Sequence, residues 1–228
     1  MRLDRMLSNA HAGTRSQVKK LVKEKRVKVN GVLAKASSMQ IDEVNDEVTL
    51  DDIPVIYEEH MYLMLHKPAG YISATEGNVP TVMDLIYEDN NGLFPCGRLD
   101  KDTEGLLLIT NDGPLAHTLL SPKRHVEKEY YVEHALEDDI VRLQSGISYN
   151  GESYKPAKVN MISPRSCTLT ITEGKYHEIK FMFQALGDKV TYLKRLRMKN
   201  LVLDESLKPG EYRYLTEEEI TDLKADEQ

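Results

Sequence analysis

The sequence lacks features that would place it in several common classes of protein. Its 228 residues contain two cysteines, Cys96 and Cys167, which form no CxxC pair and have no metal-binding spacing to histidine. A disulfide scaffold and a structural zinc site are therefore not expected. No apolar run approaches the roughly 20 residues that span a bilayer, and the opening MRLDRMLSNA carries charges where a signal peptide needs an apolar stretch. We expect a protein of the reducing cytoplasm, without a membrane partner.

A positive net charge is also missing, but the distribution of charge is uneven. The formal net charge is −7, whereas residues 1–36 hold ten lysines and arginines and two acidic residues, which gives this stretch +8 and the remainder −15. This segregation predicts a basic module, suited to a phosphate backbone, carried by an acidic body. An ordinary solvated basic helix face is the alternative explanation of the charge pattern alone.

The first fifty residues show the order helix, helix, hairpin. Residues 3–7 place apolar side chains at helical spacing, and Thr14 with Gln17 forms the capping-box pattern before a second helix. Asn30-Gly31 between two extended runs predicts a two-residue hairpin. Basic side chains are expected along one exposed side of the second helix and into the hairpin: Arg15, Lys19, Lys20, Lys23, Arg26 and Lys28.

This layout, RLDRMLSNAHAGTRSQVKKLVKEKRVKVNGVLAK, resembles the S4-like alpha-L RNA-binding module. The resemblance implies that the six basic side chains just named contact RNA phosphates. Residues 53–60 have the character of a linker. We therefore predict two domains, an S4-like domain with its linker at 1–58 and a second domain at 59–228.

The second domain has the pattern of an α+β fold. Short apolar runs broken by turn residues predict strands at YLMLH, YISA, GLLLIT, YYVEHAL, CTLTIT and within LVLDESLKPGEYRYL. Helices are predicted at 82–87, 115–120, 138–145, 177–186 and 217–225. Together these elements predict a mixed or antiparallel sheet flanked by helices.

One segment, GRLDKDTEGLLLITNDG at 97–113, places carboxylates in a polar turn before a buried strand. Its start imitates a calcium-binding EF-hand loop, but the twelfth position is Asn111 rather than a bidentate Glu. The intervening residues 106–109 are apolar and offer no side-chain oxygen. We therefore expect no metal site.

The same segment is similar to the signature of the RsuA and RluB group of pseudouridine synthases. Three further segments follow the family's order: KPAG at 67–70, KEYYV at 128–132 and EGKYHEIK at 173–180. The resemblance implies isomerisation of uridine in RNA: the bond from ribose C1′ to uracil N1 breaks, the base turns, and it rejoins through C5. This reaction has no redox change and requires no cofactor.

The resemblance also implies roles for individual residues. Asp100 matches the catalytic carboxylate, and Lys180 matches the basic residue that keeps it ionised. Tyr130 matches the aromatic wall that lies against uracil and is a candidate proton acceptor. Arg98 is expected to fill the space that a flipped nucleotide vacates. Six residues are expected to shape the loops beside the site: Lys67, Pro68, Gly70, Gly97, Thr103 and Gly105.

A second basic cluster lies between residues 175 and 199, with seven lysines and arginines against two acidic residues. We expect it to form an RNA-binding face around the cleft, with contacts from Lys175, Arg195 and Arg197. His177 is expected to be packed or RNA-facing rather than a metal ligand. The chain has Glu178 and Phe181 where the family commonly carries Gln and Arg, so some RNA contacts are expected to be absent.

The sequence alone leaves several functions and substrates open. The details of the sequence look closest to the RsuA branch, which implies 16S rRNA in a free or partly assembled small subunit, bound by a monomer. A 23S rRNA target of the sister branch is the nearest alternative. A non-catalytic RNA-binding protein of ribosome assembly is another, as is a carboxylate-based glycoside hydrolase, although that chemistry usually needs a second positioned acid.

Overall fold

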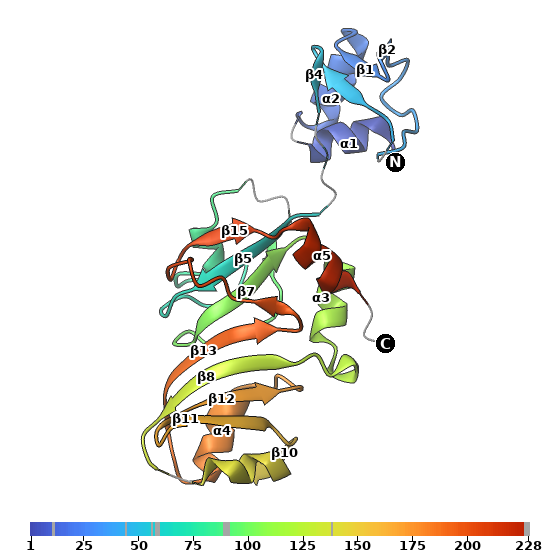
Figure 1. Ribbon diagram of the computed structural model, residues 1–228. Helices are drawn as coiled ribbons and strands as arrows, with labels where there is room; N and C mark the ends of the chain where they lie inside the picture. Colours follow the sequence, from blue (N-terminus) through green and yellow to red (C-terminus); the bar gives the residue numbers. More distant parts are fainter. Residues whose placement is uncertain are drawn as a thin grey trace. The chain divides into compact units, whose positions relative to one another are not determined.

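The computed structural model describes residues 1–10, 12–43, 45–55, 57, 60–88, 92–137 and 139–225. Parts of the expected linker and the first residue of the helix expected at 138–145 lie outside these residues. The chain divides into two compact units, Met1–His60 and Met61–Gln228, and each is described by itself (Figure 1). No helix in the described ranges is long and apolar enough to cross a membrane.

The first unit packs two helices on a small antiparallel sheet. The helices are α1 (Leu3–Asn9) and α2 (Arg15–Lys23), and the strand order is β2 (Val32–Leu33), β1 (Val27–Val29), β3 (Val48–Leu50) and β4 (Ile53–Pro54). The capping box of Thr14 and Gln17 is confirmed, because each side chain accepts a hydrogen bond from the other residue's backbone. The hairpin is also confirmed: Asn30 and Gly31 both have positive φ, at 52° and 76°, as a tight two-residue turn requires.

The second unit is built on one mixed sheet of nine strands. The main path runs β11 (Lys158–Ser163), β12 (Ser166–Ile171), β8 (Lys128–His134), β13 (Val190–Met198), β7 (Glu104–Thr110), β5 (Tyr62–Lys67) and β15 (Tyr212–Tyr214). Two short strands attach to it, β6 (Phe94–Pro95) to β7 and β14 (Leu201–Val202) to β13. The β13–β7 pair is parallel and its neighbours are antiparallel, which confirms the expected α+β class.

Helices cover both faces of this sheet (Figure 1). Helix α4 (Glu178–Ala185) packs on one face through Ile179, Met182 and Phe183. On the other face lie α3 (Gly113–Leu120) and α5 (Glu217–Lys224). A two-stranded hairpin, β9 (Ile147–Tyr149) and β10 (Glu152–Tyr154), stands outside the main sheet, with β9 in contact with α4.

Some predicted elements differ from those observed. Residues 71–74 form no strand, only an isolated bridge between Ile72 and Thr81. The segments expected to be helical at 82–87 and 138–145 are short 3₁₀ turns, η1 (Val82–Leu85) and η3 (Ile140–Ser145), and a third, η2 (Pro122–Arg124), follows α3. The central strand β13 was not predicted, because its three cations among nine residues look like a solvated surface segment.

Candidate active site

The signature segment forms the turn that leads into β7, and a buried lysine supports it from below. Lys67, fully buried at the end of β5, donates hydrogen bonds to the carbonyl oxygens of Pro68 (3.0 Å), Lys101 (3.3 Å) and Thr103 (2.7 Å). Burial lowers the pKa of Lys67 to about 8, against the opposing effect of nearby carboxylates. Two backbone carbonyls of the turn and one of the neighbouring 67–70 loop are thus bound by one side chain.

Glycines at the ends of the turn allow close approach of other elements. A Cβ atom on Gly105 would lie 2.2 Å from the carbonyl oxygen of Arg195 on β13, and Gly105 has a φ of +105°. A Cβ on Gly97 would lie 2.8 Å from Cδ2 of Leu120. Gly70, with a φ of +96°, donates its N–H to Lys101 at 2.7 Å. The six residues expected to shape the loops therefore lie in the turn or in the loop beside it. Only glycine fits at position 105 without displacing β13.

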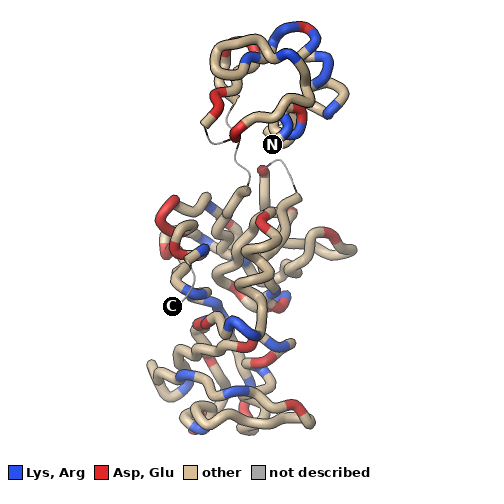
Figure 2. Tube along the Cα trace, turned by 90° about the vertical axis from the view of Figure 1, so that its right-hand side faces the viewer, with Lys and Arg blue, Asp and Glu red and all other residues tan. Residues whose placement is uncertain are grey.

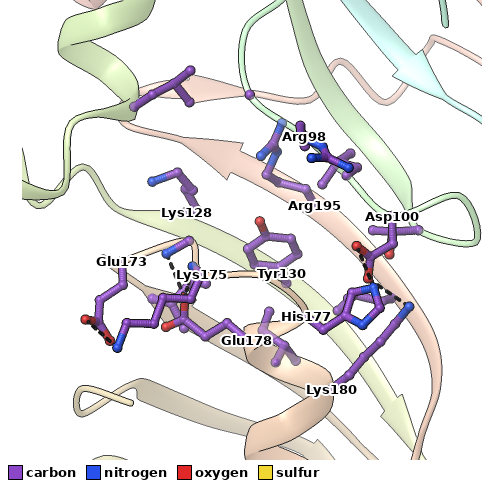
Figure 3. Close-up of a pocket in the computed structure, with 18 residues that line it drawn as sticks. Arg98, Asp100, Lys128, Tyr130, Glu173, Lys175, His177, Glu178, Lys180 and Arg195 are labelled. Carbon is purple, nitrogen blue, oxygen red and sulfur yellow. Dashed lines mark hydrogen bonds and ion pairs between the residues drawn. The ribbon is translucent and has the colours of Figure 1, made fainter. Parts of the chain in front are cut away.

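The turn presents Asp100 to two cationic or ionisable side chains from the start of α4. Lys180 Nζ lies 2.8 Å from Asp100 Oδ2 and 2.7 Å from Asp102 Oδ1. His177 Nε2 lies 3.4 Å from Asp100 Oδ1 (Figure 3). Burial lowers the pKa of Lys180, but the hydrogen bonds to Asp100 and Asp102 outweigh it, so the net shift is upward. Lys180 is therefore a protonated partner for Asp100 at neutral pH.

Asp100 and Lys180 line a cavity of about 110 Å³ that also contains Tyr130. Tyr130 projects from β8 and is 6% exposed. Apolar walls come from Ile171, Ile179 and Leu193. Asp100, Tyr130 and Lys180, the three residues expected to be catalytic, therefore line one small cavity, and the ion pair of Asp100 with Lys180 lies at its wall.

Two further side chains, His177 and Lys128, also line this cavity. His177 has left-handed backbone (φ 49°) and stacks on Tyr176 with ring centroids 3.7 Å apart, which turns its ring toward Asp100. Lys128 lies two residues before Tyr130 on β8, and residues i and i+2 of a strand share a face. That spacing was the available signal for Lys128.

The basic run between residues 175 and 199, expected to form an RNA-binding face around the cleft, does not point all of its cations in one direction. A bulge in the β13–β8 register places Arg195 opposite Tyr130 but Arg197 opposite Glu129. Arg195 consequently lines the cavity and is 2% exposed, while Arg197 bonds Glu129 at 3.0 Å and Glu127 at 3.1 Å. The two arginines point in different directions because the bulge shifts the strand alternation by one residue.

The remaining pocket cations also differ in their partners. Arg98 is exposed at the cavity, as expected for a residue on the RNA side. Lys175 lines the cavity as well, but its ammonium group lies 2.7 Å from Glu152 and donates to the carbonyl of Ser153 at 2.7 Å. Only Arg98 of these two therefore extends without a carboxylate partner among the described residues.

The departures from the family pattern have structural reasons. Glu178 is buried, and its Oε2 accepts hydrogen bonds from the backbone N–H groups of Gly174 and Lys175, both at 2.7 Å. Burial raises the pKa of Glu178. Phe181 stacks on Tyr149 with ring centroids 5.8 Å apart. Glu178 supports the turn before α4, and Phe181 packs α4 against β9. Neither side chain therefore makes the surface contact with RNA that the family's Gln or Arg would make.

The first unit carries many lysines and arginines, shown blue in Figure 2, and those of α2 are exposed. Arg15, Lys19 and Lys23 are exposed, and no carboxylate in the described residues pairs with them. Lys20 has a distant partner, Glu24, at 3.8 Å. Of the cations beyond the helix, Arg26 and Lys28 bind Asp51 and Asp52, so the charges of these two are largely compensated.

Within the described ranges, no three His, Cys, Asp or Glu side chains are grouped so that they could hold a metal ion. Asp100 and Asp102 instead share the ammonium group of Lys180, which occupies the position that a cation would take between them.

Comparison with known proteins defines the class of this protein. Residues 61–185 match the family model described as RNA pseudouridylate synthase, and residues 1–48 match the S4 domain. A crystal structure described as a pseudouridylate synthase is 40% identical, with a TM-score of 0.69, and covers 98% of this chain and 99% of that chain. The protein is therefore a pseudouridine synthase, an isomerase, with an S4 domain that binds RNA.

Two relatives narrow the class to a family. An uncharacterized RNA pseudouridine synthase of Bacillus subtilis, YtzG, is 48% identical over 96% of this chain and 97% of its own length. Ribosomal small subunit pseudouridine synthase A of Haemophilus influenzae is 41% identical over 98% of this chain and 99% of its own length. The chain belongs to the RsuA family of pseudouridine synthases, as its signature segment predicted.

Proposed function

We propose that this protein converts a uridine of 16S rRNA to pseudouridine, with Asp100 as the catalytic carboxylate. The observation that carries the proposal is the ion pair of Asp100 with Lys180 at the cavity that also holds Tyr130. The 16S target is supported by relatives from Haemophilus influenzae, Yersinia pestis and Vibrio cholerae, each 41% identical and each called a ribosomal small subunit pseudouridine synthase.

The reaction requires an ionised carboxylate beside the ribose and a surface for the detached uracil. Asp100 can attack C1′, add to uracil C6 or remove a ribose proton, and each of these steps needs its charged form. Lys180 stabilises that charge from 2.8 Å away. The ring of Tyr130 then forms the wall on which the uracil turns, with its hydroxyl near the reacting carbon.

The target base must leave its stack before it can enter so small a cavity. Flipping costs a few kcal/mol, and the exposed Arg98 is the side chain that fills the vacated space. Residues 1–58 supply the phosphate contacts and the linker, and residues 59–228 perform the chemistry. We assign the free or partly assembled small subunit as substrate and a monomer as the active form, so a concentration-dependent mass well above 26.0 kDa would contradict the assignment.

The test is pseudouridine mapping by carbodiimide labelling and primer extension. Transcripts of 16S and 23S rRNA, and small-subunit assembly intermediates, are treated with the wild type and with Asp100→Asn. We expect one new stop in 16S rRNA that the variant does not produce, although the variant should bind RNA as the wild type does. A stop in 23S rRNA would move the protein to the sister branch, and no stop on any RNA would favour the binding-only alternative. Equal turnover by Asp100→Asn would refute the role of Asp100.

A further inference from the structure

The wall of the cavity contains two buried cations that no carboxylate pairs with in the described residues. Arg195 is 2% exposed; its Nε donates to the carbonyl of Leu106 at 2.7 Å, and its Nη2 has no hydrogen-bond partner. Lys128 is 6% exposed and donates to the carbonyl of Val126 at 3.0 Å. Buried charges in proteins are almost always paired. An unpaired arginine and lysine on one cavity wall therefore point to an anionic ligand.

The described surroundings supply little of the missing negative charge. Burial lowers the pKa of Lys128 and the positive charge of Arg195 lowers it further, and the carboxylate of Glu178 opposes them only in part. The nearby Glu178 already accepts two backbone hydrogen bonds through Oε2. A third polar group of the cavity, the Thr103 hydroxyl, is also buried and has no hydrogen-bond partner among the described residues. The cavity therefore contains hydrogen-bond donors, on Arg195 and Thr103, that have no partner among the described residues, next to two buried cations.

The cationic wall and the carboxylate belong to different parts of the same cavity. Arg195 lies directly opposite Tyr130 in the β13–β8 register, and Lys128 precedes Tyr130 by two residues. Asp100, His177 and Lys180 come from the signature turn and α4 (Figure 3). A base that lies on the ring of Tyr130 would therefore have its ribose toward Asp100 and its ring edge toward Arg195 and Lys128.

We propose that Arg195, assisted by Lys128 and the Thr103 hydroxyl, binds the carbonyl oxygens of the target uracil and stabilises the base as an anion while it is detached. This inference rests on the proposed function. It adds a binding subsite for the leaving base to the carboxylate site at Asp100. Preorganised donors that meet charge developing in the transition state are among the strongest contributors to catalysis.

The electron count of the step explains why such a subsite is needed. When the C1′–N1 bond breaks, its electron pair stays with the base, whose negative charge is shared by N1, O2 and O4. C1′ takes an electron pair from an Asp100 oxygen, or the C2′ proton passes to Asp100 and its bonding pair forms a double bond to C1′. Rejoining reverses these transfers: a pair from C5 forms the C1′–C5 bond, C5 loses a proton and N1 gains one. The charge on the base exists only between the two steps.

A backbone phosphate is the other anionic group that the RNA carries. Phosphates follow the protein surface, however, whereas Arg195 is 2% exposed and Lys128 is 6% exposed. The flipped base is the part of the RNA that reaches such depth. The base is therefore the expected ligand, and the experiment below distinguishes it from a phosphate.

The experiment compares Arg195→Met with the wild type in two measurements. One is the single-turnover rate of pseudouridine formation with saturating enzyme, and the other is the RNA dissociation constant across a series of salt concentrations. We expect the rate to fall by about 100-fold, with the dissociation constant and its salt dependence unchanged. Arg195→Lys should recover part of the rate because it retains a buried charge. The matched control is Arg165→Met, an exposed arginine outside the cavity, which should leave both quantities unchanged.

Each other outcome has a defined meaning. A full rate with weaker binding and a salt slope reduced by about one would identify a phosphate contact and overturn the proposal. A full rate with unchanged binding would overturn it as well. Thermal unfolding reports whether each variant is folded, and Lys128→Met tests the same subsite if Arg195→Met is not. Absence of turnover in the wild type would instead refute the proposed function, so the two failures remain distinct.

Discussion

Lys67 shows how one buried charge fixes the geometry of the active-site turn. Its ammonium group donates to three backbone carbonyls, two of them within three residues of Asp100. Leaving a buried carbonyl without a donor costs about 1–3 kcal/mol, so the turn depends on this side chain more than on any contact at the surface. The motif indicated a loop role for Lys67, but its complete burial required the three-dimensional structure.

The variant Lys67→Met should be destabilised and should have a lower turnover rate, because Asp100 would no longer be held toward the cavity. Its stability should also respond differently to pH. The pKa of Lys67 is about 8 when folded, below its unfolded value, so between about pH 8 and pH 10 the unfolded chain binds more protons at this residue. Its contribution to the free energy of unfolding therefore rises with pH, by about 2 kcal/mol up to about pH 9.5.

Urea unfolding at about pH 7 and about pH 9.5 checks this prediction, and the quantity compared is the difference between the wild type and Lys67→Met. That difference should grow at the higher pH, since other titrating groups contribute equally to both proteins. A constant difference would show that the buried lysine is not linked to folding in this way.

The signature segments predicted which residues lie at the cavity, but they did not predict where every side chain points. Asp100, Tyr130 and Lys180 lie in segments far apart in the sequence, and the fold brings them to one cavity. The position of Arg195 was not foreseeable from composition, because an arginine in a basic run usually faces solvent. What buries it is its place on the central strand, and that depends on long-range pairing.

At the scale of elements, β13 illustrates where sequence patterns fail. Helix α2, its capping box and the Asn30-Gly31 hairpin are local features, and local patterns predicted them correctly. Strand β13 pairs with β8 and β7, whose partner residues come about 60 and 90 residues earlier, and a bulge interrupts its alternation between Arg195 and Arg197. Neither the pairing nor the bulge leaves a periodic pattern in the sequence.

The contact between β7 and β13 gives a prediction for Gly105. Because a Cβ there would lie 2.2 Å and 2.6 Å from backbone atoms of Arg195, the substitution Gly105→Ala must displace one strand from the other. The positive φ of Gly105 adds backbone strain. We expect a loss of at least about 3 kcal/mol in the free energy of unfolding, measured by chemical denaturation, together with loss of turnover.

Gly113 is the matched control for this substitution. It lies at the first position of α3, and a Cβ atom there would meet nothing within 4 Å. Gly113→Ala should therefore change the free energy of unfolding by less than about 1 kcal/mol, and alanine's higher helix propensity favours the variant. Similar stability of the two variants would mean that the β7–β13 contact can relax without cost.

For the whole molecule, the net charge of −7 conceals a division of labour between the two units. The basic stretch at the start predicted an RNA-binding module, and the S4 domain match confirms it. Counting charges did not show which cations are available to RNA. Arg26 and Lys28 are paired with Asp51 and Asp52, whereas Lys19 and Lys23 on α2 have no such partner in the described part of the first unit. Tertiary contacts therefore reduce the effective charge of the module below the +8 of its sequence.

This difference predicts unequal salt dependence for two double variants that remove the same charge. The logarithm of RNA affinity falls linearly with the logarithm of salt concentration, by about 0.7 to 0.9 for each phosphate contact. The variant Lys19→Gln/Lys23→Gln should lower this slope by about 1.5, because both side chains are free to bind phosphates. The variant Arg26→Gln/Lys28→Gln should lower it by less than about half as much, since each of its cations must first leave a carboxylate.

Filter binding across a salt series measures both slopes, and the single-turnover rate at saturating enzyme should be unchanged in either variant. Equal slopes would mean that Asp51 and Asp52 release their partners on binding, so that the ion pairs of the free protein do not select the cations that meet RNA.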